Sequence, residues 1–329
     1  MLQSTQFPAV IEASQFGGDL DKLVATCRTT MEDGLCQSGA VLFRKTGVRT
    51  AEQFGEFARL VSQDIPDFKE ESSPRSVVHG HVLTSTDYPH EYPIQFHTEY
   101  SYASKWPLHL QFCCLHPPAV SGETPISDTR QVLANMRPST RAAFERKGVL
   151  YVRNYRPKAG VSWQAGFGTQ DPDIVEKVCE EAKIDCEWRS GDVLHTRQRS
   201  AAVVRHPKTG DLVWFNHAFI FNVRAFEPAA LRETLMNCPD DDPLSTNTLF
   251  GDGTPINAEI IEELRGLYAD ASTRWPWEQG DILIIDNMLT AHGRAPFQGK
   301  RKIVVVMTDS IARSSVESIY GDEVSALSR

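Results

Sequence analysis

The sequence predicts a mainly β fold, with a β-sandwich or barrel core and helices packed outside it. Short apolar runs rich in β-branched residues recur along the 329 residues, each bounded by Gly, Pro, Asn or Asp. These runs do not alternate regularly with helical segments, as the strands of a doubly wound parallel sheet would. No glycine-rich phosphate-binding motif follows a predicted strand, which disfavours nucleotide-binding folds. Because there is no repeat or long linker, residues 1–329 are predicted to form one domain.

Seven of the apolar runs are predicted to be strands. They occupy residues 40–43, 108–115, 149–153, 201–206, 212–216, 282–286 and 302–308. The stretch HPKTGDLVWF at 206–215 should form a hairpin turn between two of these strands. Cys113 and Cys114 lie within the apolar run LQFCCL, so we expect them to be buried thiols.

Segments with helical period lie between the strands. One follows Thr50, a predicted N-cap, and the segment DPDIVEKVCEEA predicts another helix from Asp171. A third helix is expected to begin with Thr254 as its N-cap and Pro255 at its first position. These helices should pack against the outside of the β core.

Composition and charge favour a small-molecule partner. The formal net charge of −9 and the isoelectric point near 5.6 provide no general cationic field for nucleic acid or anionic lipid. No run approaches the roughly 20 apolar residues of a membrane span, and the N-terminal residues resemble no signal peptide. Seven scattered cysteines without a CxxC pair indicate reduced thiols. We expect a cytoplasmic protein that binds neither nucleic acid nor membranes, and the sequence does not determine its oligomeric state.

A histidine and a glutamate two positions apart, His97 and Glu99 in QFHTEYSY, are candidate metal ligands. The pair alone carries little weight, because ten His and 43 acidic residues give about one such spacing by chance. A second segment, WEQGDILIIDNMLTAHGRAPFQGKRK, adds His292 at the edge of a buried strand and the basic pair Arg301 and Lys302. Alternation along an extended chain would put His97 and Glu99 on one face.

The residue types in these two segments favour iron over zinc. Two histidines and one carboxylate on one face of an Fe(II) ion leave three positions open, whereas zinc prefers four tetrahedral ligands. A chelating 2-oxoacid can fill two of the open positions on the metal. Its second carboxylate, distal to the metal, then needs a fixed cation as a partner. Arginine suits that role because its planar fork binds a carboxylate through two hydrogen bonds.

These motifs, in this order, resemble the taurine/2-oxoglutarate dioxygenase (TauD/TfdA) superfamily of Fe(II)- and 2-oxoglutarate-dependent enzymes over about residues 35–310. The resemblance rests on FHTE at 96–99, PPAVSGETPISDTR at 117–130, VWFN at 213–216 and WPWEQGDILIIDNMLTAHGRAPFQGKRK at 275–302. It is strongest for the clavaminate-synthase-like and SyrP-like branch, whose members often act in nonribosomal peptide and related biosynthetic pathways. The implied fold is a double-stranded β-helix, a jelly-roll of two facing antiparallel sheets.

The resemblance implies that His97, Glu99 and His292 are the iron ligands. Many members of the superfamily use Asp where this chain has Glu99, and the clavaminate-like branch also uses Glu. Related halogenases lack the carboxylate ligand and place chloride there, so its presence argues for hydroxylation or desaturation.

The resemblance also implies a binding site for 2-oxoglutarate. Thr124 would form a hydrogen bond with the distal carboxylate, and Arg301 would pair with it. Ser121 stands where the first Gly of the usual motif is found. More distant members place their key arginine at the position of Lys302, but bidentate binding favours Arg301.

The implied activity is hydroxylation of an unactivated C–H bond, with O2 and 2-oxoglutarate as co-substrates and succinate and CO2 as products. The expected substrate is an amino acid or amino-acid-derived acid, free or tethered to a carrier protein, with β-hydroxylation of an aspartyl group as one case. Two alternatives remain: a desaturase or hydroxylase of a free small sulfonate or carboxylate, and a non-catalytic metal- and 2-oxoacid-binding protein on the same fold.

Further residues are expected around the open end of the jelly-roll. Asn216 or His217, after the predicted strand that contains VWFN, is a candidate for substrate contact. The inserted segment at about 155–200 and the loop at 65–95 are expected to cover that end and select the substrate. Arg294 could pair with Asp286 or reach the pocket, and of these two a structural pair with Asp286 is preferred.

Overall fold

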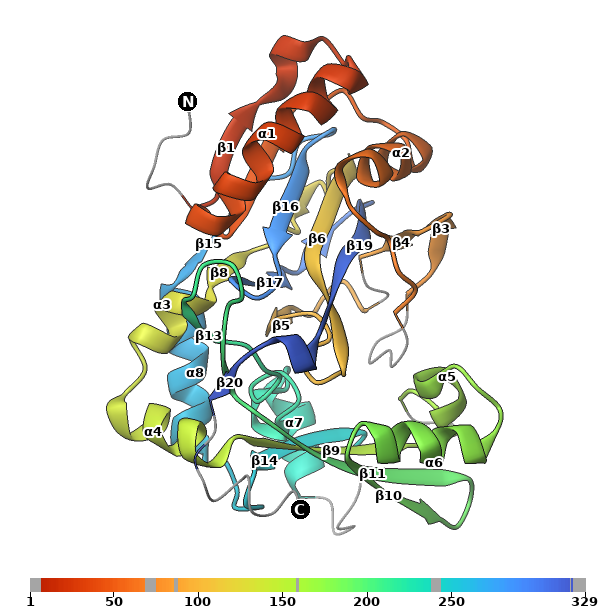
Figure 1. Cartoon of the computed structure of the whole chain (residues 1–329), viewed down its shortest axis with the longest axis vertical. Helices are drawn as coiled ribbons and strands as arrows, with labels where there is room; N and C mark the ends of the chain where they lie inside the picture. The colour runs from red at the N-terminus through yellow and green to blue at the C-terminus, as the bar shows by residue number, and fades with distance from the viewer. Residues whose placement is uncertain are drawn as a thin grey trace.

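A seven-stranded sheet is the largest element of the computed structural model, which describes residues 7–68, 75–85, 88–157, 160–237, 244–319 and 321 (Figure 1). In sheet order its strands are β1 (Ala9–Glu12), β2 (Ala40–Arg44), β16 (Ile282–Asp286), β6 (Lys105–His116), β19 (Lys302–Ala312), β4 (Val82–Thr84) and β3 (Val77–His79). The long strands β6 and β19 pair antiparallel along most of their length.

A four-stranded sheet shares its hydrophobic core with this large sheet. Its strands, in order, are β15 (Ser272–Thr273), β8 (Ile126–Asp128), β17 (Thr290–Arg294) and β5 (Ile94–His97). Phe112 of β6, Ile126 of β8 and Ala291 of β17 belong to one buried cluster. The mainly β fold with flanking helices is therefore confirmed, and the four-stranded sheet carries the two candidate histidine ligands.

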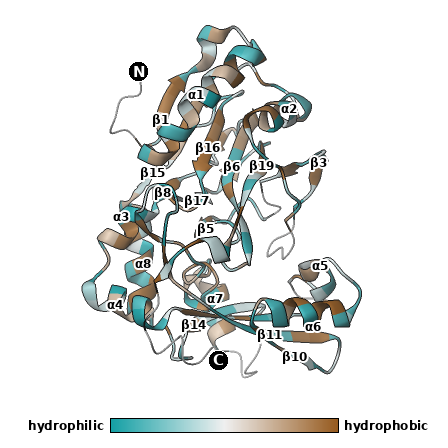
Figure 2. Cartoon of the chain, in the orientation of Figure 1, coloured by the Kyte–Doolittle hydropathy of each residue, from teal (hydrophilic) through white to brown (hydrophobic). Residues whose placement is uncertain are grey.

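Strand β6 is buried along residues 106–115, which explains why apolar side chains dominate this predicted strand on both faces. Leu110 and Phe112 pack in the core shared by the two sheets, whereas Cys113 and Leu115 pack in a second cluster on the opposite face. That second cluster includes residues of α1 (Leu20–Ser38) and α2 (Ala51–Val61). A strand buried on both faces has no solvent side on which polar residues would be favourable. The hydrophobic colouring of β16, its neighbour in the sheet, has the same cause (Figure 2).

The segment at about 155–200, which is predicted to be an insertion, contributes two strands to a third sheet. Strands β10 (Ile184–Arg189) and β11 (Val193–Ser200) extend a sheet that also contains β9 (Val149–Tyr155) and β14 (Thr246–Phe250), in the order β10-β11-β9-β14. Helices α5 (Trp163–Phe167) and α6 (Pro172–Glu181) contribute Trp163 and Val175 to a small cluster beside this sheet. As predicted, Asp171 is the N-cap of α6, and its side chain accepts a hydrogen bond from Asp173 N–H at 3.0 Å.

The predicted hairpin at 206–215 is confirmed, since β12 pairs antiparallel with β13 across it. The remaining strands are β12 (Val203–Arg205), β13 (Leu212–Trp214), β20 (Ser318–Ile319), β7 (Val120–Ser121) and β18 (Phe297–Gln298). The remaining helices are α3 (Thr129–Ala134), α4 (Pro138–Lys147), α7 (Ala229–Met236) and α8 (Ala258–Asp270), with the short helices η1 (Ala13–Phe16), η2 (Val223–Ala225) and η3 (Arg313–Ser315). Among the described residues, no helix is both long and apolar enough to cross a membrane.

The predicted start of one helix is wrong. Helix α8 begins at Ala258 and is capped by Asn257, whose Oδ1 accepts a hydrogen bond from Ile260 N–H at 2.9 Å. Thr254 donates from its backbone N–H and its hydroxyl to Asp252, and Pro255 forms a β-bridge with Leu249. The Thr-Pro pair therefore closes the turn after β14. By contrast, Thr50 caps α2 as predicted, since its hydroxyl accepts from Gln53 N–H at 3.2 Å.

Candidate active site

Two strands of the four-stranded sheet place the candidate histidines opposite one another. Strand β17 pairs antiparallel with β5, and His292 is the direct partner of His97 in the register. The register shifts between His292 and Arg294. A Cβ atom on Gly293 would lie 2.7 Å from the carbonyl oxygen of Ile94, so this close approach of the two strands requires glycine. Backbone pairing thus brings together two residues that are far apart in the sequence.

Glu99 lies in the turn after β5, and a side chain from a distant turn holds its backbone. The strand ends at His97, so the expected extended alternation does not continue to Glu99, and Tyr100 has a φ of 56°. The buried Asn287 accepts a hydrogen bond from Glu99 N–H at 2.6 Å. Its Nδ2 donates to the carbonyl oxygens of Glu99 and Pro107 at 2.8 and 2.9 Å. This amide contact, rather than strand alternation, positions the glutamate.

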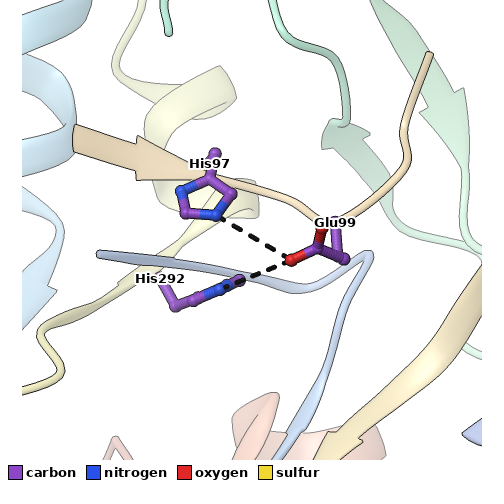
Figure 3. A group of neighbouring side chains, drawn as sticks. All are labelled: His97, Glu99 and His292. Carbon is purple, nitrogen blue, oxygen red and sulfur yellow. Dashed lines mark ion pairs between the residues drawn. The ribbon is translucent and has the colours of Figure 1, made fainter. Parts of the chain in front are cut away.

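The side chains of His97, Glu99 and His292 converge (Figure 3). Both histidine Nε2 atoms lie 3.9 Å from Oε2 of Glu99, and the three ligand atoms all lie within 4.8 Å of one another. Ligand atoms bound at roughly 2 Å from one ion lie roughly 3 Å apart in octahedral geometry, so a small contraction would complete the site. Within the described part of the chain, this is the only such group of three His, Cys, Asp or Glu residues. Two histidines and one carboxylate are the donor set of a facial Fe(II) site.

Burial sets the protonation states that metal binding needs. It lowers the pKa of His97 and brings the pKa of His292 well below its usual value, so both imidazoles are neutral at neutral pH. Burial alone would raise the pKa of Glu99, but the adjacent Arg75 guanidinium outweighs this effect, and the pKa is lowered. The site therefore offers two neutral nitrogen atoms and one ionised carboxylate.

Two contacts that the sequence did not predict orient these ligands. Arg75 Nη2 lies 2.6 Å from Glu99 Oε2, and both side chains are almost fully buried. His97 Nδ1 lies 2.9 Å from the carbonyl oxygen of Gln95. Because a carbonyl only accepts, Nδ1 carries the proton and the lone pair of Nε2 is left for a metal. Arg75 belongs to no recognisable motif, so only the folded chain shows its role.

A narrow cavity beside the histidines contains both residues expected to bind 2-oxoglutarate. Thr124 and Arg301 line it, and Arg301 Nη2 donates to the Thr124 hydroxyl at 3.3 Å. Arg301 Nε donates to the carbonyl oxygen of Gly122 at 2.9 Å, and no carboxylate among the described residues pairs with this arginine. Burial lowers the pKa of Arg301 to about 10, which still leaves it cationic at neutral pH. Lys302, the alternative cation, is exposed at the start of β19.

A larger cavity of about 330 Å³ also reaches His97 and Glu99. Its apolar lining includes Ile94, Ile220, Phe221, Phe226, Leu231 and Leu235, and its polar lining includes Gln95, His217 and Glu227. These residues come from the segments 88–99 and 217–235. The expected covering role of residues 155–200 and of the loop at 65–95 therefore stays a prediction, and residues 69–74 and 86–87 of that loop lie outside the described residues.

The two substrate candidates occupy different environments. His217 lines the larger cavity, its Nδ1 lies 2.6 Å from Ser101 Oγ, and burial brings its pKa well below the usual value. Its Nε2 has no hydrogen-bond partner in the part of the chain that the structure describes. Asn216 instead donates to the carbonyl oxygen of Ala202 and accepts from Ala218 N–H, both at 2.8 Å. Of the pair, His217 is the one positioned to meet a ligand.

The expected pairing of Arg294 with Asp286 is wrong. Asp286 Oδ2 lies 3.0 Å from Nε2 of the buried His206. Arg294 is two residues after His292 on β17, so alternation places both side chains on the same face of the strand, and both line the narrow cavity. Its guanidinium donates to the carbonyl oxygens of Tyr88, Pro89 and Tyr92 at 2.9, 2.6 and 2.9 Å.

The fold and the donor set together define a class, the jelly-roll oxygenases that bind Fe(II) through two histidines and a carboxylate. The model of the family described as "Taurine catabolism dioxygenase TauD, TfdA family" matches residues 3–308, and the chain belongs to this family. It is therefore an oxidoreductase that uses Fe(II), 2-oxoglutarate and O2. Dapdiamide synthesis protein DdaC of Enterobacter agglomerans is 31% identical over 310 residues, which cover 94% of this chain and 93% of the relative. A clavaminate synthase-like protein of Arabidopsis thaliana is 28% identical, covering 92% and 93%.

Solved structures share the fold. A taurine dioxygenase from Burkholderia xenovorans has a TM-score of 0.53 at 16% identity, covering 99% of this chain and 95% of that chain. PvcB, described as an Fe, alpha-ketoglutarate dependent oxygenase from an isonitrile synthetic pathway, has a TM-score of 0.52 at 14% identity, covering 90% and 84%. These similarities confirm the predicted jelly-roll.

Replacing Asn287 with aspartate should weaken metal binding through the position of Glu99. Aspartate cannot donate to the carbonyl oxygens of Glu99 and Pro107, so the turn that carries the Glu99 carboxylate loses these two hydrogen bonds. We expect metal affinity to fall about tenfold to a hundredfold, the range for partners of metal ligands. Titration with Mn(II) measures this effect. Asn257→Asp is the matched control, because aspartate also caps a helix; equal affinity in both variants would contradict the role of Asn287.

Proposed function

We propose that this enzyme hydroxylates an unactivated C–H bond of an amino acid or amino-acid-derived acid in a biosynthetic pathway, with Fe(II) held by His97, Glu99 and His292. One observation carries the proposal: the three residues lie where two cavities meet. His97 lines both cavities, His292 lines the narrow one and Glu99 lines the larger one. A metal ion at this point would be accessible to a co-substrate from one cavity and to a substrate from the other.

The residues around the ion have separate tasks in this proposal. Bound iron would supply the oxidative chemistry that converts 2-oxoglutarate and O2 to succinate and CO2 while oxidising the substrate. Thr124 and Arg301 would hold the distal carboxylate of 2-oxoglutarate, because a buried guanidinium without an acidic partner favours an anion. Phe221 and Leu235 would exclude water from the substrate side.

The lining of the larger cavity supports a substrate whose carboxyl group is masked, as in the thioester of an aminoacyl group on a carrier protein. None of its described lining residues is Lys or Arg, which a free sulfonate or carboxylate would need as a partner. His217 Nε2 and the Gln95 amide can form hydrogen bonds with a neutral acyl group. The biosynthetic setting is supported by the dapdiamide synthesis relative and the isonitrile-pathway neighbour.

Succinate formation tests this proposal. The enzyme with Fe(II), 2-oxoglutarate and O2 would be given a panel of amino acids, aspartate included, each as the free acid and as its thioester. We expect at least one thioester to raise succinate formation about tenfold more than its free acid, since an unpaired carboxylate is costly to bury. Mass spectrometry of the product distinguishes the gain of one oxygen atom from the loss of two hydrogen atoms.

Two outcomes would change the proposal. Stronger stimulation by free acids or small sulfonates would support the alternative substrate class. Loss of two hydrogen atoms would show desaturation instead of hydroxylation. His292→Ala provides the background rate in every assay, because it removes one of the three proposed ligands.

A further inference from the structure

Arg294 is a second buried guanidinium beside the narrow cavity. Its exposed fraction is 5%, and it lines this cavity together with Arg301, Thr124 and His292. No carboxylate among the described residues pairs with it. Two guanidinium groups on one small cavity repel each other, and an anion between them would offset this repulsion. The narrow cavity therefore has two positive charges, whereas binding of the distal carboxylate of 2-oxoglutarate requires only that of Arg301.

Two parts of the Arg294 side chain face different surroundings. The terminal nitrogen atoms donate to three carbonyl oxygens of the loop 88–92. That loop contributes Tyr88 to the larger cavity. Nε is buried, and no described residue forms a hydrogen bond with it. A buried N–H group without a partner is unfavourable, so this donor is available for a ligand in the cavity that Arg294 lines.

We propose that Arg294 donates its Nε–H to 2-oxoglutarate and thereby couples the binding of this co-substrate to the position of the loop 88–92 at the substrate cavity. The inference rests on the proposed placement of 2-oxoglutarate between Arg301 and the metal. Arg301 and Thr124 take the distal carboxylate, and Arg294, beside His292, approaches the part of the molecule nearer the iron. One side chain then contacts the co-substrate and the wall of the substrate cavity at the same time.

Two substitutions separate the Nε–H contact from the loop contact. Arg294→Lys keeps a positive charge near the carbonyl oxygens of the loop but has a methylene in place of Nε–H. Arg294→Met removes both contacts. We expect 2-oxoglutarate to bind about tenfold more weakly to each variant than to the wild type, as the loss of one charge-assisted hydrogen bond predicts. The measurement is titration of the Mn(II)-loaded protein without substrate, and Arg205→Met, on an exposed hairpin, is the control that should bind normally.

Hydrogen exchange of the loop 88–92 provides the second readout. In the wild type, 2-oxoglutarate should slow exchange in this loop, and in Arg294→Met it should not. Wild-type affinity in both variants, with faster loop exchange in Arg294→Met, would show a purely structural role and overturn the inference. If Arg294→Met does not fold, wild-type affinity of Arg294→Lys for 2-oxoglutarate is sufficient by itself to overturn the inference. Failure of the wild type to bind 2-oxoglutarate would instead refute the proposed function.

Discussion

Alanine at His292 or at His97 is expected to abolish the faint visible absorption band that forms when Fe(II) and 2-oxoglutarate are added without oxygen. The band requires iron and the chelating co-substrate in one complex, and either substitution leaves only two of the three converging ligand atoms. Succinate formation should fall at least about a hundredfold, since even residues that only support metal ligands reach that effect. Anaerobic absorption spectroscopy and a succinate assay measure the two effects.

An exposed histidine supplies the control for this experiment. His116 lies at the exposed end of β6 and is not part of the group of three. His116→Ala should therefore keep the band and the activity. If the band persisted in both His97→Ala and His292→Ala, the assignment of the iron ligands would be wrong.

Arg301→Ala is expected to raise the 2-oxoglutarate requirement roughly 10- to 100-fold. The guanidinium is the cation beside Thr124, and a hydrogen bond to a charged group contributes about 1.5–3 kcal/mol, or roughly tenfold for each 1.4 kcal/mol. Arg301→Lys should recover part of the affinity, because a lysine keeps the charge but not the planar fork. The apparent KM for 2-oxoglutarate measures both changes.

Lys302→Ala is the matched control for Arg301. The lysine is exposed, whereas Arg301 lines the narrow cavity, so its removal should leave the KM for 2-oxoglutarate unchanged. A large rise in KM for Lys302→Ala and none for Arg301→Ala would reverse the assignment of the two residues.

The seven predicted strands are all present, because alternating or continuous apolar runs reflect local chain geometry and burial. The start of a helix depends on which side chain accepts hydrogen bonds from the free backbone N–H groups of the first turn. Two neighbouring residues can both be candidates for this N-cap. At 254–258 the sequence offered a Thr-Pro pair, but Asn257 provides the cap because Thr254 is bonded to Asp252. Local pattern alone does not decide between such candidates.

The three candidate ligands could be named from the sequence because their motifs keep their spacing and order. The contacts that hold these candidate ligands in place could not be identified from the sequence. Arg75 and Asn287 reach Glu99 from distant segments, and neither lies at a spacing that a linear pattern would reveal. Their role depends on which backbone segments pack together.

The sequence by itself determined the mainly β architecture, the family motifs and the types of the candidate ligands, since these depend on residue chemistry and short-range periodicity. The tertiary structure decided which histidine faces which, through the pairing of β17 with β5, and which cation lines the narrow cavity. It also directed Arg294 to the loop 88–92 instead of Asp286. The physical reason is that a buried polar group takes the partner that the packed backbone brings within hydrogen-bond distance, and that partner is set by long-range strand pairing.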